Sequence, residues 1–482
     1  MIEKIFLKYK SMNRQLKLVF WFTFIGVLQK GISVITTPIF TRVLSTEDYG
    51  IFSVFNAYYV VLAIIITLNL DLSVLNNAFI KMGAAKEKIV SSFQSLALVL
   101  SGICFVGAVV FREQLSAVMG LPVVVVVFMF LGLVFREPYA IWIAYKRYQY
   151  DYKKAAAVTI TVSFMTPLAS FLAIFFTTGN QGVARVIAFV CANGIVPGFL
   201  FYFVNYKKDK TFYDRTLWTY ALGFSVPLVA HYLSESLLNQ TDRIMINAYS
   251  GTGDAAVYSV AYSAASLFSI FATSLNTAFV PWQYQKLKEK EYKMLGKVAS
   301  IVFVIVALLL FMLILFAPEV VAVLAGPKYV GAVYLIPTLS ASVFFGFVYQ
   351  VFGRVELYYE KKAYVVVGTV TATILNIVLN MWWIPQFGYY AAGYSTLISH
   401  IVLLVMHVFF YEKVVKDYME GEKVYNIRNC VIISGCVLAA AFVTTLLYPY
   451  LLVRLLLLLV FAGIAILKRE LLFSLIKMFR SK

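Results

Sequence analysis

The most constraining feature of the sequence is an apolar stretch, residues 16–40, that carries a lysine, Lys30, close to its middle. A helix rises about 1.5 Å per residue, so this stretch can cross a hydrocarbon layer about 30 Å thick with some tilt. Lys30 would then lie near the membrane midplane, where a cation costs about 2.5 to 3.5 kcal/mol on insertion scales. We therefore expect Lys30 to face a water-filled cavity or a partner, and it is a candidate binding residue.

The whole chain has the composition of an integral membrane protein. Of its 482 residues 62% are hydrophobic and 13% charged, whereas about a quarter of the residues of a soluble protein are charged. The apolar segments that we expect to span the membrane as helices number fourteen: 16–40, 50–72, 91–112, 121–144, 155–176, 183–204, 218–240, 255–282, 294–317, 331–353, 363–384, 388–411, 429–448 and 450–467. The loops between them are too short for a catalytic domain, so function is expected within the membrane.

The chain has a net charge of +18, and most of its 41 lysines and arginines lie in alternate loops and at both ends. Membrane topology can therefore explain the positive charge. Basic residues accumulate in short cytoplasmic loops, so this alternation predicts fourteen spans with both termini in the cytoplasm. A nucleic-acid-binding protein would need its basic residues clustered on a soluble domain, and nucleic acid is therefore not an expected partner.

No motif predicts catalysis, a cofactor or a metal. The four cysteines lie in apolar segments without metal or redox spacing, and phosphate-binding glycine loops, zinc-ligand spacings and nucleophile motifs are missing from the sequence. We expect no enzyme. The N-terminus also lacks a signal-peptide cleavage pattern, so the first span is expected to serve as an uncleaved insertion signal.

Two segments about 200 residues apart are similar, 36–54 and 237–260. Each has an arginine at a helix end, then an acidic residue, Asp48 or Asp254, and then a Ser-Val start to the next span. Six spans separate the copies, which predicts a parallel repeat related by an axis along the membrane normal. We expect two six-helix lobes with pseudo-two-fold symmetry, 1–205 and 215–412, two further helices in 429–467, and a cytoplasmic tail, 468–482.

Several other ionisable residues lie within the predicted spans. His231 and Glu235 are four residues apart on one helical face and are either a cavity wall, a protonatable relay or a helix-stabilising pair. Arg136 faces either an anion in a cavity or an ion-pair partner on another helix, because its neighbour Glu137 points about 100° away. Asp71 lies near the inner end of the second span, where it serves ion coupling or is hydrated at the interface.

Together, TRVLSTEDYGIFSVFNAYY (41–59), NQTDRIMINAYSGTGDAAVYSVAY (239–262) and the 6+6+2 plan of spans resemble the bacterial polysaccharide flippases. These are the O-antigen, capsule and exopolysaccharide repeat-unit translocases of the multidrug/oligosaccharidyl-lipid/polysaccharide exporter superfamily. The resemblance implies two lobes around a central cavity, in the bacterial cytoplasmic membrane. It also implies alternating-access transfer of an undecaprenyl-diphosphate-linked oligosaccharide, with polysaccharide assembly proteins as candidate partners.

On this interpretation, cationic Lys30, Arg136 and protonated His231 hold the diphosphate, while Glu235, Asp71 and Glu137 are the candidates for H⁺ or Na⁺ coupling. Two members of the same superfamily remain as alternatives, a cation-coupled drug or metabolite exporter and a peptidoglycan lipid-precursor flippase. Such exporters usually carry acidic groups in the first span, where this chain has a lysine. A polysaccharide polymerase would need a large external loop.

Overall fold

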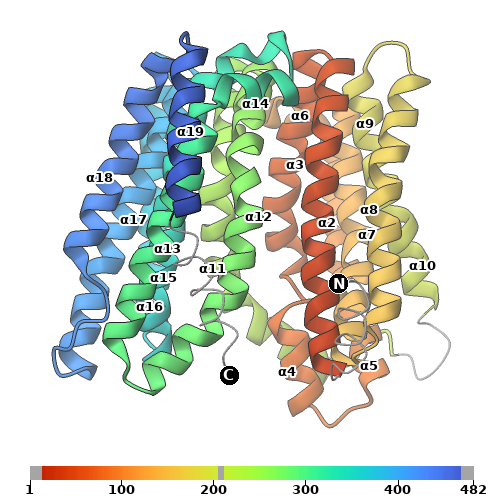
Figure 1. Cartoon of the computed structure of the whole chain (residues 1–482). Coiled ribbons are helices and arrows are strands. Elements are labelled where there is room, and N and C mark those ends of the chain that lie inside the picture. The colour runs from red at the N-terminus through yellow and green to blue at the C-terminus, as the bar shows by residue number, and fades with distance from the viewer. Residues whose placement is uncertain (1–13, 205–210, 468–482) are drawn as a thin grey trace, which may run out of the picture. The chain divides into compact units, whose positions relative to one another are not determined.

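A computed structural model describes residues 14–204 and 211–467, which are almost entirely helical (Figure 1). The long helices are α2 (Arg14–Val43), α3 (Thr46–Thr67), α5 (Lys86–Val110), α7 (Val123–Tyr148), α8 (Tyr152–Phe175), α9 (Gln181–Val190) continued through a π turn into α10 (Val196–Val204), α11 (Arg215–Ser250), α12 (Thr252–Lys288), α13 (Tyr292–Leu315), α15 (Ile336–Tyr358), α16 (Lys362–Phe387), α17 (Tyr389–Tyr418), α18 (Ile427–Val443) and α19 (Leu451–Leu467). Short helices are α4 (Ser73–Lys81), α6 (Arg112–Met119) and α14 (Ala317–Leu324).

Eleven helical segments of the described chain are long and apolar enough to cross a membrane. The more polar α11 and α12 and the shorter α19 bring the helical segments that match predicted spans to fourteen. The all-α membrane fold expected from the sequence is therefore confirmed. The predicted tail, 468–482, lies outside the described residues.

The chain divides into two compact units, 1–256 and 257–482, with the boundary at the start of α12. Helix α11, which the repeat assigns to the second lobe, packs in the first unit against α3, α4 and α5. The Trp218 indole N–H donates to the Ser92 carbonyl (3.1 Å), and the Tyr232 and Ser73 hydroxyls lie 3.2 Å apart. Contacts thus divide the chain about 40 residues after the predicted lobe boundary, and the lobes 1–205 and 215–412 stay a prediction.

Several long helices end in the same kind of turn. The turn between α7 and α8 and the turn between α15 and α16 place Tyr150 and Glu360 in the left-handed region, with φ of 56° and 61°. In each turn the N–H of the next residue donates to the carbonyl five positions back, at 3.0 and 2.9 Å. The same pattern recurs between α12 and α13, where Lys290 has a φ of 57° and the Glu291 N–H donates to the Lys286 carbonyl at 3.0 Å. It is a common way for a helix to end, so the six-span repeat stays a prediction.

The start of α11 provides a stability prediction, because Asp214 caps the helix and also pairs with α5. Its carboxylate accepts the Leu217 N–H (3.1 Å) and lies 2.8 Å from Lys88 Nζ. The hydrogen bond from Lys88, with that of Leu217, lowers the pKa of Asp214. The resulting stabilisation is complete above the unfolded pKa, about 3.9, and is lost as the pH falls through the lowered folded pKa.

We expect Asp214→Ala to reduce the unfolding free energy by about 1 kcal/mol through loss of the helix cap. Asp214→Asn should lose much less, since asparagine caps equally well and a largely hydrated ion pair contributes little. Thermal unfolding in detergent at neutral pH checks both variants. Equal losses would show that the ion pair with Lys88, and not the cap, is the stabilising contact.

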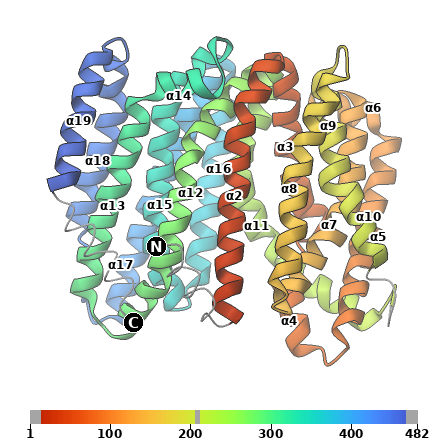
Figure 2. The same cartoon turned by 45° about the vertical axis from the view of Figure 1, so that its right-hand side comes forward.

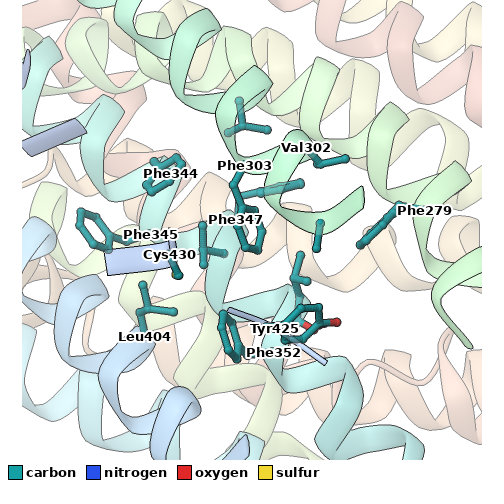
Figure 3. Close-up of a cluster of buried hydrophobic side chains, with 14 of the residues drawn as sticks. Phe279, Val302, Phe303, Phe344, Phe345, Phe347, Phe352, Leu404, Tyr425 and Cys430 are labelled. Atoms are coloured by element: carbon teal, nitrogen blue, oxygen red, sulfur yellow. Dashed lines mark hydrogen bonds between the residues drawn. The ribbon is translucent and has the colours of Figure 1, made fainter. Parts of the chain in front are cut away.

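The second unit has a large hydrophobic core built by α12, α13, α15, α17 and α18. Figure 3 shows its aromatic side chains, among them Phe303, Phe347 and Phe352. A polar layer lies between α16 and α17, where Ser395 bonds Asn380 and Asn376 Nδ2 donates to Thr396 Oγ1 (3.3 Å). Asparagines spaced four apart on one helix face are typical of such interhelical hydrogen bonds.

The last helix of the described residues, α19, is held to the rest of the second unit by a buried arginine. α19 (Figure 2) packs against α13, where the Phe311 and Phe461 rings lie 5.0 Å apart, and its Arg454 is 3% exposed. Arg454 Nη1 donates to Glu319 of α14 (2.6 Å) and to the Leu315 carbonyl (3.2 Å). An arginine in the apolar segment 450–467 therefore has a structural role.

Candidate functional site

The candidate site of the first unit is built around a break in the second predicted span. Helix α3 ends at Thr67, Leu68 and Asn69 adopt left-handed φ values of 55° and 48°, and α4 begins at Ser73. Asparagine tolerates this conformation, but a leucine in it is strained by about 1 to 2 kcal/mol. A break inside an apolar span exposes backbone N–H and C=O groups that the surrounding bundle must satisfy.

Glu137 of α7 accepts a hydrogen bond from one of the backbone N–H groups at this break. Its Oε1 accepts the Asp71 N–H at 3.1 Å, and the side chain is 1% exposed. The Thr67 hydroxyl at the end of α3 donates to the Ala63 carbonyl of the preceding turn at 2.8 Å. Asp71 and Glu137, two of the predicted ion-coupling residues, are thus brought together although 66 positions separate them in the sequence.

Arg136 is the cation of this cluster. Its Nη1 lies 4.0 Å from Glu137 Oε2, and its guanidinium lies 6.0 Å from the centre of the Tyr59 ring. Although neighbouring residues leave a helix about 100° apart, the long arginine side chain brings Nη1 to this distance from the carboxylate. Whether Arg136 binds an anion in a cavity or a partner on another helix stays a prediction. The contact is at the limit of an ion pair, and the side chain of Arg136 is 35% exposed.

The cluster keeps unused hydrogen-bonding capacity. Within the described part of the chain, Arg136 Nη1, Glu137 Oε2 and the Tyr59 hydroxyl are buried and have no hydrogen-bond partner. Buried polar groups are usually bonded, so these three atoms can receive an ion, water or a polar ligand group. Two carboxylates, Asp71 and Glu137, lie near one arginine here, so a bound proton or cation would improve the charge balance.

A contact between α5 and α7, next to Glu137, involves two residues that are not among the predicted site residues. Pro138 follows Glu137 and has no N–H to donate to the preceding turn. The Gln94 side chain of α5 donates to the Pro138 carbonyl at 2.7 Å. A proline within the span was visible in the sequence, but its partner on another helix was not.

The remaining predicted site residues lie on other helices. Among the described residues, the charged groups that act on Glu137 are Asp71 and Arg136. Lys30 is half-buried on α2, which packs along α8. The adjacent Gln29 donates to the Ser163 hydroxyl of α8 at 3.0 Å. Glu235 is exposed on α11. The side chain of His231 lies outside the described residues, so the predicted pairing of His231 with Glu235 stays a prediction.

These features define a multi-pass helical membrane protein with ionisable side chains clustered at a broken span. The family model described as "Polysaccharide biosynthesis protein" matches residues 16–285, more than half of the chain. The protein therefore belongs to this family. The MatE family model matches residues 227–382.

Individual relatives are distant. The chain is 22% identical over 349 residues to "Lsg locus putative protein 1" of Haemophilus influenzae, covering 70% of this chain and 84% of that protein. It is 20% identical over 390 residues to the "probable low-salt glycan biosynthesis flippase Agl15" of Haloferax volcanii, covering 79% of this chain and 80% of the relative.

Solved transporter structures share the fold. The lipid II flippase MurJ, in an inward closed conformation, superposes with a TM-score of 0.72 at 14% identity and covers 94% of this chain and 99% of its own. An inward-facing multidrug resistance MATE family transporter of the MOP superfamily gives a TM-score of 0.60 at 15% identity, covering 82% of this chain and 94% of its own. At these identities the likeness concerns the fold.

Proposed function

We propose that the protein is a flippase that moves an undecaprenyl-diphosphate-linked oligosaccharide repeat unit across the bacterial cytoplasmic membrane by alternating access, for surface polysaccharide biosynthesis. The observation that carries the proposal is the polysaccharide biosynthesis family match over residues 16–285. Lys30 and Arg136 both lie within this matched region, in the first and fourth spans. The glycan flippase name of the Haloferax relative points the same way.

The chemistry of the substrate fits these two cations. A diphosphate that leaves water needs positive partners, and charge-assisted hydrogen bonds to it are about twice as strong as neutral ones. Lys30 supplies a point charge on a flexible stem, whereas the Arg136 guanidinium offers paired donors. Arg136 Nη1 is buried without a hydrogen bond in the described chain, so a phosphate oxygen would provide the missing acceptor. The isoprenoid tail can remain in lipid.

Ion coupling is assigned to the Asp71–Glu137 pair. A phosphate group that binds Arg136 neutralises the positive charge that stabilises the two carboxylates. The carboxylates then favour uptake of a proton or Na⁺. Release of the lipid-linked substrate would reverse this exchange. Glu235 remains a second candidate, since it is exposed and its carboxylate is accessible. Both termini are assigned to the cytoplasm because the basic loops alternate along the chain.

Export measured in a Lys30→Ala variant that inserts at the normal level tests the binding role of Lys30. Loss of a charged hydrogen bond removes about 1.5 to 3 kcal/mol, so export should fall by about tenfold or more. Lys423→Ala is the matched control, because Lys423 is 60% exposed and pairs only with Glu412 on the surface at 3.2 Å among the described residues. Unimpaired export in the Lys30 variant would refute the role.

A second candidate substrate is the peptidoglycan lipid precursor, favoured by the extent of the structural match to MurJ. This molecule is also a diphosphate-linked lipid, so Lys30 and Arg136 would bind it by the same contacts. Deleting the gene separates the two substrates. Viable cells that lose surface polysaccharide support the repeat unit, while loss of viability that a known lipid II flippase rescues supports the precursor.

A further inference from the structure

The second unit contains a buried pair of ionisable side chains that the proposed function does not use. Glu356 of α15 and His407 of α17 are both 0% exposed, and Glu356 Oε1 lies 2.8 Å from His407 Nδ1. α17 packs along both α15 and α16, so the pair is enclosed within one unit. Neither residue is among the candidates predicted from the sequence.

The surrounding backbone is shaped around the imidazole ring. A Cβ atom on Gly368 of α16 would lie 2.9 Å from His407 Nε2, and one on Gly353 of α15 would lie 3.4 Å from Nδ1. The Tyr349 ring lies 5.2 Å from the imidazole on a further side. Within the described part of the chain, Glu356 Oε2 and His407 Nε2 are buried without hydrogen-bond partners.

Tyr349 is the titratable side chain that faces the pair. The other titratable groups on the helices packed around the pair include Arg354 on α15, Tyr364 on α16, Tyr411 and Lys413 on α17, Cys430 on α18 and Tyr292 on α13.

These six side chains make their contacts away from the Glu356–His407 pair. Arg354 is two positions from Glu356, hence on the far side of α15, where it donates to the Gln283 side chain. Tyr364 stacks on an aromatic ring of α17 with Lys413 beside it, and the Tyr411 hydroxyl accepts two backbone N–H groups. Cys430 and Tyr292 belong to the hydrophobic core.

Charge balance then determines how many protons the pair carries. Suppose that one proton lies between Glu356 Oε1 and His407 Nδ1, and that Nε2 carries none. The pair then has a charge of −1, and no cation faces it. A second proton, on Nε2, makes the pair neutral overall. Burial strongly disfavours an uncompensated charge, so we expect the neutral form. In water, where the carboxyl and imidazole pKa values are about 4.3 and 6.5, the same pair would carry −1 at neutral pH.

We propose that Glu356 and His407 form a proton-binding site whose occupancy depends on the packing of α15, α16 and α17. When these helices are packed, the pair holds one proton more than it would in water. When they part and water enters, the Oε1–Nδ1 hydrogen bond breaks and one proton passes to water, leaving a carboxylate and a neutral imidazole. Repacking takes a proton back. A role of this proton in driving transport rests on the proposed flippase function. Proton binding by the pair does not depend on that function.

Nitrogen-15 NMR of the histidine-labelled full-length protein in nanodiscs tests the site directly. The chain has only three histidines, and the spectrum of His407→Gln assigns the His407 signals by difference. We expect the spectrum at about pH 8 to show a proton on His407 Nε2 and a second proton shared between Nδ1 and Glu356, whereas an isolated neutral imidazole carries one proton only. A bare Nε2, or an Nδ1 that shares no proton, in the natural protein at that pH would overturn the proposal, because the pair would then hold no extra proton.

Two variants complete the test. In Glu356→Gln the carboxyl no longer needs a compensating charge, so one ring nitrogen of His407 should become bare at the same pH. His400→Gln is the matched control on the same helix, where the ring Nδ1 contacts the Thr396 carbonyl at 2.8 Å, and it should leave the His407 signals unchanged. An unchanged His407 spectrum in Glu356→Gln would contradict the shared proton.

Flipping assays in liposomes separate this site from the proposed function. If the site couples to transport, Glu356→Gln should flip a lipid-linked oligosaccharide but lose the dependence of the rate on an imposed pH gradient. A gradient dependence equal to that of the natural protein overturns the coupling role. Absence of flipping by the natural protein under all gradients overturns the flippase function, while the NMR result on proton binding stands.

Discussion

Glu137→Ala is expected to reduce the unfolding free energy of the first unit by about 3 kcal/mol, near the lower end of the range for breaking a buried ion pair. The substitution leaves the Asp71 N–H at the break in the second span without its acceptor. It also removes the counter-charge of Arg136, although this arginine is partly exposed, at 35%, and so is partly screened. Thermal unfolding in detergent and the amount of inserted protein measure the effect.

Glu137→Gln is the matched variant, because the amide oxygen can still accept the Asp71 N–H. We expect it to recover most of the lost stability while removing the ionisable group. If Glu137 takes up the coupling ion, export by this variant should become insensitive to the proton or sodium gradient. Equal destabilisation by alanine and glutamine would show that the charge of Glu137, and not the hydrogen bond, holds the broken span in place.

The spans and their order could be predicted from the sequence because hydropathy and loop charge act over whole segments of 20 or so residues. The break after Thr67 could not. Leu68 and Asn69 carry no glycine or proline signal, and their left-handed conformations are enforced by packing. The contact of Glu137 with the Asp71 backbone likewise joins segments 66 residues apart, which no local pattern reports.

Candidate site residues were found where a charge lies within a predicted span, even at its end, and Glu356 was missed because it lies just beyond one. Arg136, Glu137 and Asp71 all fall within predicted spans, and the structure groups them. Glu356 falls just beyond the predicted span 331–353, where an acidic residue suggests a hydrated loop. In the structure the helix continues to Tyr358 and buries it completely. An extension of one and a half turns changed a loop residue into a buried one.

The close approach of α7 and α10 gives the second prediction of large effect, which concerns Gly198. A Cβ atom at this position would overlap the carbonyl oxygen of Phe135 on α7. Gly198→Ala should therefore force the two helices apart and destabilise the protein by about 1 to 3 kcal/mol or more, as overpacking does. Phe135 immediately precedes Arg136, so displacement of α7 should also disturb the Arg136–Glu137 cluster and lower export.

Gly107→Ala provides a control of opposite sign. Gly107 lies in α5 of the same unit, and a Cβ atom there would have no neighbouring atom within 4 Å outside its own helix. Alanine there should stabilise the helix by about 0.5 to 1 kcal/mol, because it restricts the unfolded backbone without a clash. Unfolding temperatures that move in opposite directions, with export lost only in Gly198→Ala, would establish that contact between α7 and α10 positions the charge cluster. Stabilisation by both substitutions would mean that α10 can move away from α7 without loss, and that the cluster is held by α3 and α5 alone.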